Sequence, residues 1–123
     1  MPVTYHIDKT QNVLFAKATG ELTAEDIQEF RRTAADDSEF DRRLDNIFDF
    51  RSISGVQLTG EEVRELTFGA VFHEHSRRAL VVPHELMFGM SRMYSLFIGA
   101  EADVMKDFYD MDEARRWLGL DQI

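Results

Sequence analysis

The polar residues best suited to chemistry lie at the ends of two short apolar runs. Asp49 and Arg51 lie at the end of one run, Ile47–Phe50, and His84 follows the other, Ala79–Val82. If both runs are parallel strands, their carboxyl ends meet at one edge of a sheet, which is where open α/β sheets bind ligands. We therefore expect Asp49, Arg51 and His84 to form a polar rim. A simpler role is open to two of them: Asp49 would accept backbone N–H bonds from the following loop, and His84 would be exposed.

A metal site is the other chemistry that the sequence suggests. His73 and His75 flank Glu74, but positions i and i+2 of a helix point to different faces and cannot close on one ion. The chain has no cysteine, which removes thiol nucleophiles and thiolate ligands. It also lacks a glycine-rich phosphate loop and a serine on a nucleophile elbow. We therefore expect no bound metal, no cofactor and no enzymatic activity.

Apolar side chains give a stronger indication of function than the polar ones. The segment Leu86–Ala100 is dense in methionine and aromatic residues, and the predicted helix that starts at Thr59 adds Phe68 and Phe72. One covering layer of helices cannot bury all of them, and adaptable methionine side chains suit a variable apolar ligand or a partner surface. The alternative is that these side chains are core. The candidate binding residues are Phe68, Phe72, Phe88, Met90, Met93, Tyr94 and Phe97.

Length and charge narrow the class of partner. The 123 residues are enough for one domain, 1–123, with a hydrophobic core. The formal net charge of −9 predicts that nucleic acids are repelled. We expect an apolar or amphipathic small molecule or a protein partner, with a homodimer and peripheral membrane contact as further possibilities. The lack of cysteine and of a signal peptide at the N-terminus predicts a cytoplasmic protein.

Apolar periodicity predicts the elements that position these residues. Val3–Ile7 alternates with a period of two, as an edge strand does, and forms a hairpin with a second strand, Val13–Thr19, which Gly20 ends. Thr23 with Asp26 predicts the start of the first helix. Apolar residues on both faces of the strand that follows predict that it is central in the sheet.

The second half of the chain continues the alternation of strands and helices. A loop over Ser52–Gly55 leads to a helix that Thr59 and Glu62 cap, then to the strand Ala79–Val82, which Pro83 ends. The helix Leu86–Ala100, the strand Val104–Phe108 and a last helix from Asp110, with Glu113 three positions later, to Gly119 complete the chain. The order β-β-α-β-α-β-α-β-α predicts an α/β fold with a mixed, mainly parallel five-stranded sheet, an antiparallel first strand and four helices.

Five segments in this order carry a family resemblance. They are Gly20–Thr23, Phe48–Arg51, Arg78–Val82, Phe88–Tyr94 and Glu113–Gly119. Together they resemble the STAS domains, and more closely the SpoIIAA-like proteins. The resemblance implies the strand order 1-2-3-4-5 and a non-catalytic binding domain. It extends more remotely to the CRAL-TRIO lipid carriers, which implies an apolar or amphipathic small molecule as ligand.

The same resemblance implies an alternative function. STAS domains that antagonise anti-sigma factors carry Asp-Ser-Ser-Gly before the second helix, and their second serine is phosphorylated. The matching positions are Gln57–Gly60, so that Thr59 keeps the hydroxyl while the aspartate and the first serine are replaced. A phosphate on Thr59 would gain from the helix N-terminus, but Glu61 and Glu62 lie within one turn of it. Thr59 is therefore either a phosphorylated switch or an ordinary N-cap.

Overall fold

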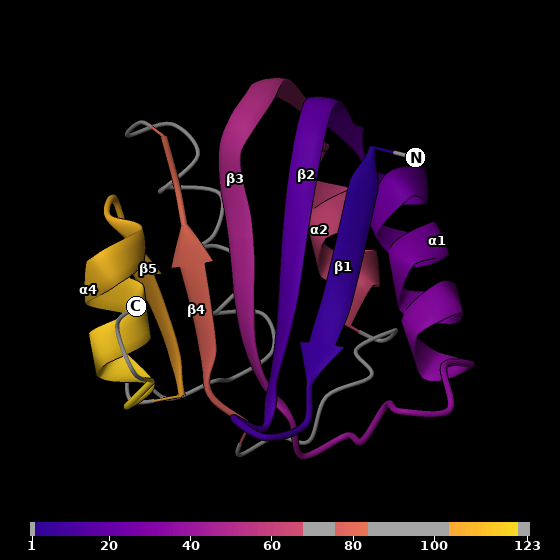
Figure 1. The fold of residues 1–123 in the computed structure, drawn as a ribbon. Helices are drawn as coiled ribbons and strands as arrows, with labels where there is room; N and C mark the ends of the chain where they lie inside the picture. Colours follow the sequence, from indigo (N-terminus) through magenta and orange to yellow (C-terminus); the bar gives the residue numbers. More distant parts are fainter. Residues whose placement is uncertain (1, 68–75, 84–103, 121–123) are drawn as a thin grey trace.

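The structure is a computed structural model that describes residues 2–67, 76–83 and 104–120. Within these ranges the chain forms one five-stranded sheet with helices on both faces (Figure 1). None of the helices in these ranges is long and apolar enough to cross a membrane. The elements are β1 (Val3–Asp8), β2 (Val13–Thr23), α1 (Ala24–Ala35), β3 (Asp45–Gln57), α2 (Gly60–Thr67), β4 (Arg78–Val81), β5 (Met105–Phe108) and α4 (Met111–Trp117).

The sheet has the predicted order and directions. Its strands follow one another as β1-β2-β3-β4-β5; β1 pairs antiparallel with β2, and the other three pairs are parallel. The short link between β1 and β2 allows only a hairpin, whereas the longer connections allow parallel crossovers. Three of the four predicted helices lie within the described ranges, and the predicted helix Leu86–Ala100 lies outside them.

Two predicted strand ends are wrong. β2 continues through Gly20 to Thr23, and β3 continues through the predicted loop Ser52–Gly55 to Gln57. The two extensions pair with each other in parallel, and each strand supplies hydrogen-bond partners for the backbone of the other. The local sequence of either segment does not predict this pairing. Gly20 has a φ of +71° where the register shifts before the next residue, so this glycine marks a bulge and not a strand end.

The extended ends of β2 and β3 form a two-stranded ribbon. β3 pairs with β4 only as far as Asp49, which lies beside Val81. Beyond that residue, the described neighbour of β3 is β2 alone. Figure 1 shows both strands curving past the end of β4. This projecting ribbon carries Ile53 and Val56, which are half-buried against the core.

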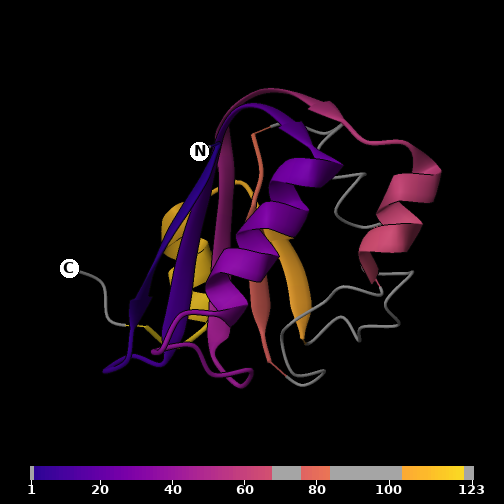
Figure 2. The same cartoon turned by 90° about the vertical axis from the view of Figure 1, so that its right-hand side faces the viewer.

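The two faces of the sheet have separate cores. α1 and α2 lie on one face and α4 on the other, as Figure 2 shows. On the α1 face, Phe48, Phe50, Leu80 and Val82 are buried together with residues of β2 and α1, while Ile47 is buried on the α4 face. These burials confirm that β3 is covered on both sides. The α4-face core consists of Val13, Ile47, Ala79, Val81, Phe108, Ala114 and Leu118.

Side-chain caps fix the starts of α1 and α4 at the predicted residues, Thr23 and Asp110, although Asp110 accepts the N–H of Asp112 and not that of the predicted partner Glu113. The Thr23 hydroxyl accepts the Asp26 N–H at 3.2 Å, and the Asp26 carboxylate accepts the Thr23 N–H at 3.0 Å. Asp110 accepts the Asp112 N–H at 2.9 Å and so caps α4. Gly119, with a φ of +73°, follows the end of that helix, where a left-handed residue is favourable.

Candidate functional site

The Asp49 carboxylate and the Arg51 guanidinium form a bidentate ion pair at the carboxyl end of β3. Arg51 Nε donates to Asp49 Oδ1 at 3.0 Å, and Arg51 Nη2 donates to Asp49 Oδ2 at 3.1 Å. The Arg51 backbone N–H also donates to Asp49 Oδ1, at 2.9 Å. Residues i and i+2 of a strand share a face, which brings the two side chains together. Asp49 thus accepts a backbone N–H as predicted, but the donor is a residue of β3 and not of a loop.

The environment of this ion pair holds both groups in their charged forms. Burial alone would raise the pKa of Asp49, but the hydrogen bonds from the Arg51 side chain and backbone, with the charges of Arg51 and Lys17, lower this pKa below its ordinary value. The hydrogen bond to Asp49 raises the pKa of Arg51, burial opposes this, and the charges of Asp49, Asp110 and Asp112 add to it. Neither group is thus adjusted to exchange a proton near neutral pH.

Replacing Asp49 by asparagine tests this ion pair through its pH dependence. Because the pKa of Asp49 is lowered on folding, the stabilisation is present above the unfolded value of about 3.9 and disappears as the pH falls through the folded value. At pH 7 we expect a loss of about 1–2 kcal/mol in the free energy of unfolding, since the Arg51 side chain is half exposed. Urea titrations between pH 7 and pH 3 measure it. A difference from the parent that stays constant over this range would contradict the assignment.

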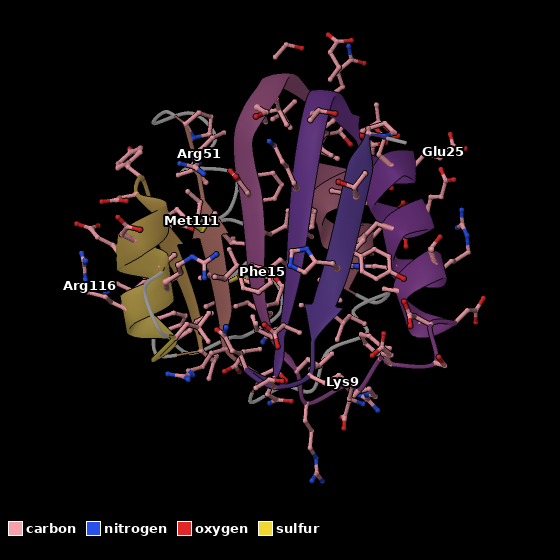
Figure 3. The ribbon with its side chains drawn as sticks, in the orientation of Figure 1. Lys9, Phe15, Glu25, Arg51, Met111 and Arg116 are labelled. Carbon is pink, nitrogen blue, oxygen red and sulfur yellow. The ribbon has the colours of Figure 1, made fainter. Side chains whose placement is uncertain are left out.

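The last helix contributes two carboxylates that the sequence analysis did not place at the rim. Asp110 and Asp112 are close enough to Arg51 to act on its pKa, and Figure 3 shows Arg51 beyond the Met111 end of α4. The available signal was that Asp110 lies two residues after the end of β5 and so lies at the same edge of the sheet. The rim in the described residues is Asp49, Arg51, Asp110 and Asp112. His84 lies outside the described residues.

The candidate apolar residues lie outside the described ranges, whereas the aromatic residues of β1, α1 and β3 on the α1 face are described. A row of aromatic rings crosses this face: the centroids of Tyr5 and Phe30 are 5.7 Å apart, those of Phe30 and Phe48 5.4 Å, and those of Phe48 and Phe50 4.4 Å. Burial and a 2.8 Å hydrogen bond to Asp37 raise the pKa of Tyr5 to about 12. The candidates outside the described ranges are Phe68, Phe72, Phe88, Met90, Met93, Tyr94 and Phe97.

Thr59 has the geometry predicted for an N-cap. Its hydroxyl accepts the Glu62 N–H at 3.0 Å, and Glu62 Oε1 accepts the Thr59 N–H at 2.9 Å. Both bonds are exposed at the start of α2, next to Glu61. The hydroxyl that a kinase would modify is thus engaged in a capping box.

No metal-binding cluster occurs among the residues that the structure describes. Their histidine, aspartate and glutamate side chains form no group of three that could hold an ion. His73 and His75 lie outside these residues, so the geometric argument against them remains a prediction from helical spacing.

Comparisons with known proteins place the chain in a family. The SpoIIAA-like family matches residues 13–119. Among solved structures, the chain is similar to an uncharacterized protein from the DUF3478 family of Shewanella loihica PV-4, which has a SpoIIAA-like fold; the identity is 23%, the TM-score is 0.63, and the match covers 94% of this chain and 93% of that one. A likeness at this identity concerns the fold alone. The comparison with curated proteins found no match. Because the family match runs from the start of β2 to the end of α4, the chain belongs to the SpoIIAA-like family.

Proposed function

We propose that this protein is a non-catalytic, STAS-type binding domain. The observation that carries the proposal is the ion pair at the edge of the sheet where α/β folds place their reactive groups. Asp49 and Arg51 neutralise each other there, and their pKa values are moved away from neutrality in opposite directions. An acid or base catalyst needs a pKa near the working pH, so this pair serves structure better than catalysis.

The ligand we propose is an apolar or amphipathic small molecule, or the apolar surface of a protein, bound on the α1 face. The described aromatic row ends at Phe50, beside the ribbon that carries half-buried Ile53 and Val56. Among the described elements, α2 packs mainly on α1. An apolar site at this end of the α1 face would be completed by Phe68, Phe72, Phe88, Met90, Met93, Tyr94 and Phe97. The remote resemblance to lipid carriers favours this ligand class.

Placing a carboxylate on this surface tests the proposal. We expect Met93→Asp and Phe97→Asp to remove a co-purified apolar molecule, or a dimer, while the circular dichroism spectrum stays that of the parent. The reason is that a charged group in an apolar site must be desolvated. Native mass spectrometry measures the mass of the oligomer and of any bound molecule together.

Ser38→Asp is the matched control, because it adds the same charge at an exposed loop position after α1. It should leave the oligomeric state and any bound molecule unchanged. Ligand uptake persists in a dilute monomer, whereas pairing is lost on dilution, so a dilution series separates the two modes. If Met93→Asp and Phe97→Asp unfold the protein, these side chains are core and the proposed site is wrong.

A phosphorylated switch at Thr59 is the alternative, and the exposure of its hydroxyl at a helix start favours it. Under our proposal, Thr59→Ala lowers the free energy of unfolding by about 1 kcal/mol and Thr59→Ser by less, since serine keeps the cap. A kinase encoded beside this protein should then transfer no phosphate to it. Transfer that is found by mass spectrometry at Thr59 and that disappears in Thr59→Ala would establish the switch instead.

A further inference from the structure

β1 and β5 are the two outer strands of the described sheet, and they differ as edges. β5 has four residues, and Lys106 and Asp107 place charges on it, which is a common protection against pairing with another strand. β1 has six residues, contains no lysine, arginine, aspartate, glutamate or proline from Val3 to Ile7, and pairs with β2 without a register shift. Among the described strands, β1 is therefore the edge with the weaker protection.

One hydrogen bond shows which backbone groups of β1 point away from β2. The Thr19 N–H donates to the Pro2 carbonyl at 2.8 Å, so these two residues form a hydrogen-bonded pair of the antiparallel ladder. Bonded and non-bonded pairs alternate along such a ladder, so the N–H and C=O groups of Val3, Tyr5 and Ile7 point outward. No other element of the described residues forms a backbone hydrogen bond with these groups.

The same three residues place apolar side chains beside the outward backbone groups. Val3 is buried, and Tyr5 and Ile7 are half-buried against the core of the α1 face. The Tyr5 ring is held there by its edge-to-face contact with Phe30 and by its hydrogen bond to Asp37. A strand added to β1 would therefore place every second side chain next to apolar groups, because side chains that lie opposite each other in an antiparallel pair share a face.

The position of α1 decides what can pair with this edge. Figure 1 shows α1 on the outer side of β1, and Figure 2 shows that the helix lies off the plane of the sheet. A second copy that paired its own β1 here through a two-fold axis would bring its α1 into the same space. A single extended segment carries no such helix, and its main chain offers N–H and C=O groups at the spacing of β1.

We propose that β1 binds an extended segment of another protein, which adds to the sheet antiparallel to β1. Apolar side chains at every second position of the segment lie next to Val3, Tyr5 and Ile7. The antiparallel direction is the more stable per residue, and addition of a strand to an exposed sheet edge is a recurring mode of peptide recognition. This goes beyond the proposed function, because the site is the edge of the sheet and its ligand is an extended main chain.

Hydrogen exchange of the free protein tests the outward groups first. In the full chain labelled with nitrogen-15, the amides of Tyr5 and Ile7 should exchange at least about tenfold faster than those of Thr4 and His6, which bond to β2. If Tyr5 and Ile7 are protected as well as their neighbours, the edge is already covered and the proposal is wrong. Protection that disappears on dilution would identify a second copy as the occupant, with the same consequence.

A synthetic peptide and two methylated analogues test the pairing itself. The peptide is acetyl-Lys-Val-Thr-Val-Thr-Lys-amide, and it should shift the amide signals of Tyr5 and Ile7 and slow their exchange. Valines that lie next to these residues in an antiparallel strand also direct their N–H groups at β1. N-methylation of both valines should therefore weaken binding at least about fivefold, because hydrogen bonds are lost. N-methylation of both threonines, whose N–H groups point to solvent, should change binding by less than about twofold.

A substitution on the protein removes one outward donor. Proline is tolerated on an edge strand where its missing N–H would face solvent, so Ile7→Pro keeps the pairing with β2 and loses a donor to the peptide. It should weaken binding at least about fivefold. Ile7→Ala is the matched control, because it shortens the side chain and keeps the N–H, and it should weaken binding by less than about threefold. Circular dichroism melting checks that each variant folds.

Three further results would overturn the proposal. They are the absence of shifts on β1 at about millimolar peptide, shifts confined to β5 or to another surface, and equal losses of binding in the two methylated analogues. If Ile7→Pro does not fold, the methylated pair decides alone, because it leaves the protein unchanged. The peptide result is also independent of the proposed apolar site, which native mass spectrometry of the free protein tests.

Discussion

Phe50→Ala is expected to lower the free energy of unfolding by about 3–5 kcal/mol, because it leaves a cavity in a core that cannot close over it. Phe50 is buried on β3, and its ring is stacked on that of Phe48 with centroids 4.4 Å apart. The stack also gains from ring geometry, by about 0.5–1.5 kcal/mol beyond the buried area. Urea denaturation followed by circular dichroism measures the change.

Two comparisons make this result specific. Phe50→Leu keeps most of the volume and should lose about half as much as alanine or less. Tyr109→Ala removes an aromatic ring that is 54% exposed, so it should change the free energy of unfolding by well under half of the Phe50→Ala value. A melting temperature of Phe50→Ala within error of the parent would be incompatible with the buried stack.

Arg77→Ala is expected to have the second large effect, a loss of about 2–3 kcal/mol. Arg77 Nη1 donates to the Trp117 carbonyl at 2.9 Å, and Nη2 donates to the Leu118 carbonyl at 3.0 Å and to Asp45 Oδ2 at 3.2 Å. These two carbonyls lie at the end of α4, where a cation also meets the negative end of the helix dipole. The arginine therefore joins three elements: α4, the start of β3 and the segment before β4.

The planar guanidinium group, which donates to three acceptors at once, provides this stabilisation, and the charge alone does not. Arg77→Lys should consequently lose most of the stabilisation, since an ammonium cannot bind both carbonyls and the carboxylate together. Trp117 is the one tryptophan of the chain, and the Arg77 guanidinium lies 5.8 Å from its ring centroid, so its fluorescence reports the local change. Arg116→Ala, at an exposed position of the same helix, is the control and should change the stability by less than about 0.5 kcal/mol. A lysine variant as stable as the parent would show that the several hydrogen bonds of the guanidinium group do not contribute to stability.

Signals that act within a few residues were predictable from the sequence. The capping boxes at Thr23 and Thr59 were predicted and are confirmed, because both partners of each hydrogen bond lie within one helical turn. The true ends of β2 and β3 were not predicted. Gly20 and Ser54 are typical of turns, and only the pairing of two segments about thirty residues apart keeps them in strands.

In the rim too, the interaction within a few residues was predictable, and the contacts between distant segments were not. Asp49 bonds to its neighbour Arg51, and this local role could be inferred from spacing. The approach of Asp110 and Asp112 to Arg51 depends on how α4 crosses the sheet, and so does the contact of Arg115 with Phe15. Such contacts between distant segments leave no periodic signal in the chain, since each residue type is also common on an ordinary solvated surface.

The agreement between strand order in the sheet and strand order in the chain has a consequence for folding. Each strand from β2 to β5 is added to the edge that the preceding strand left open, so no strand has to be inserted between two that are already paired. The β1–β2 hairpin closes a short loop, and we expect it to form first because loop closure costs less entropy over short separations. The sheet can therefore grow in the direction of translation, and β3, with its long pairing to β2, can join before β5 has left the ribosome.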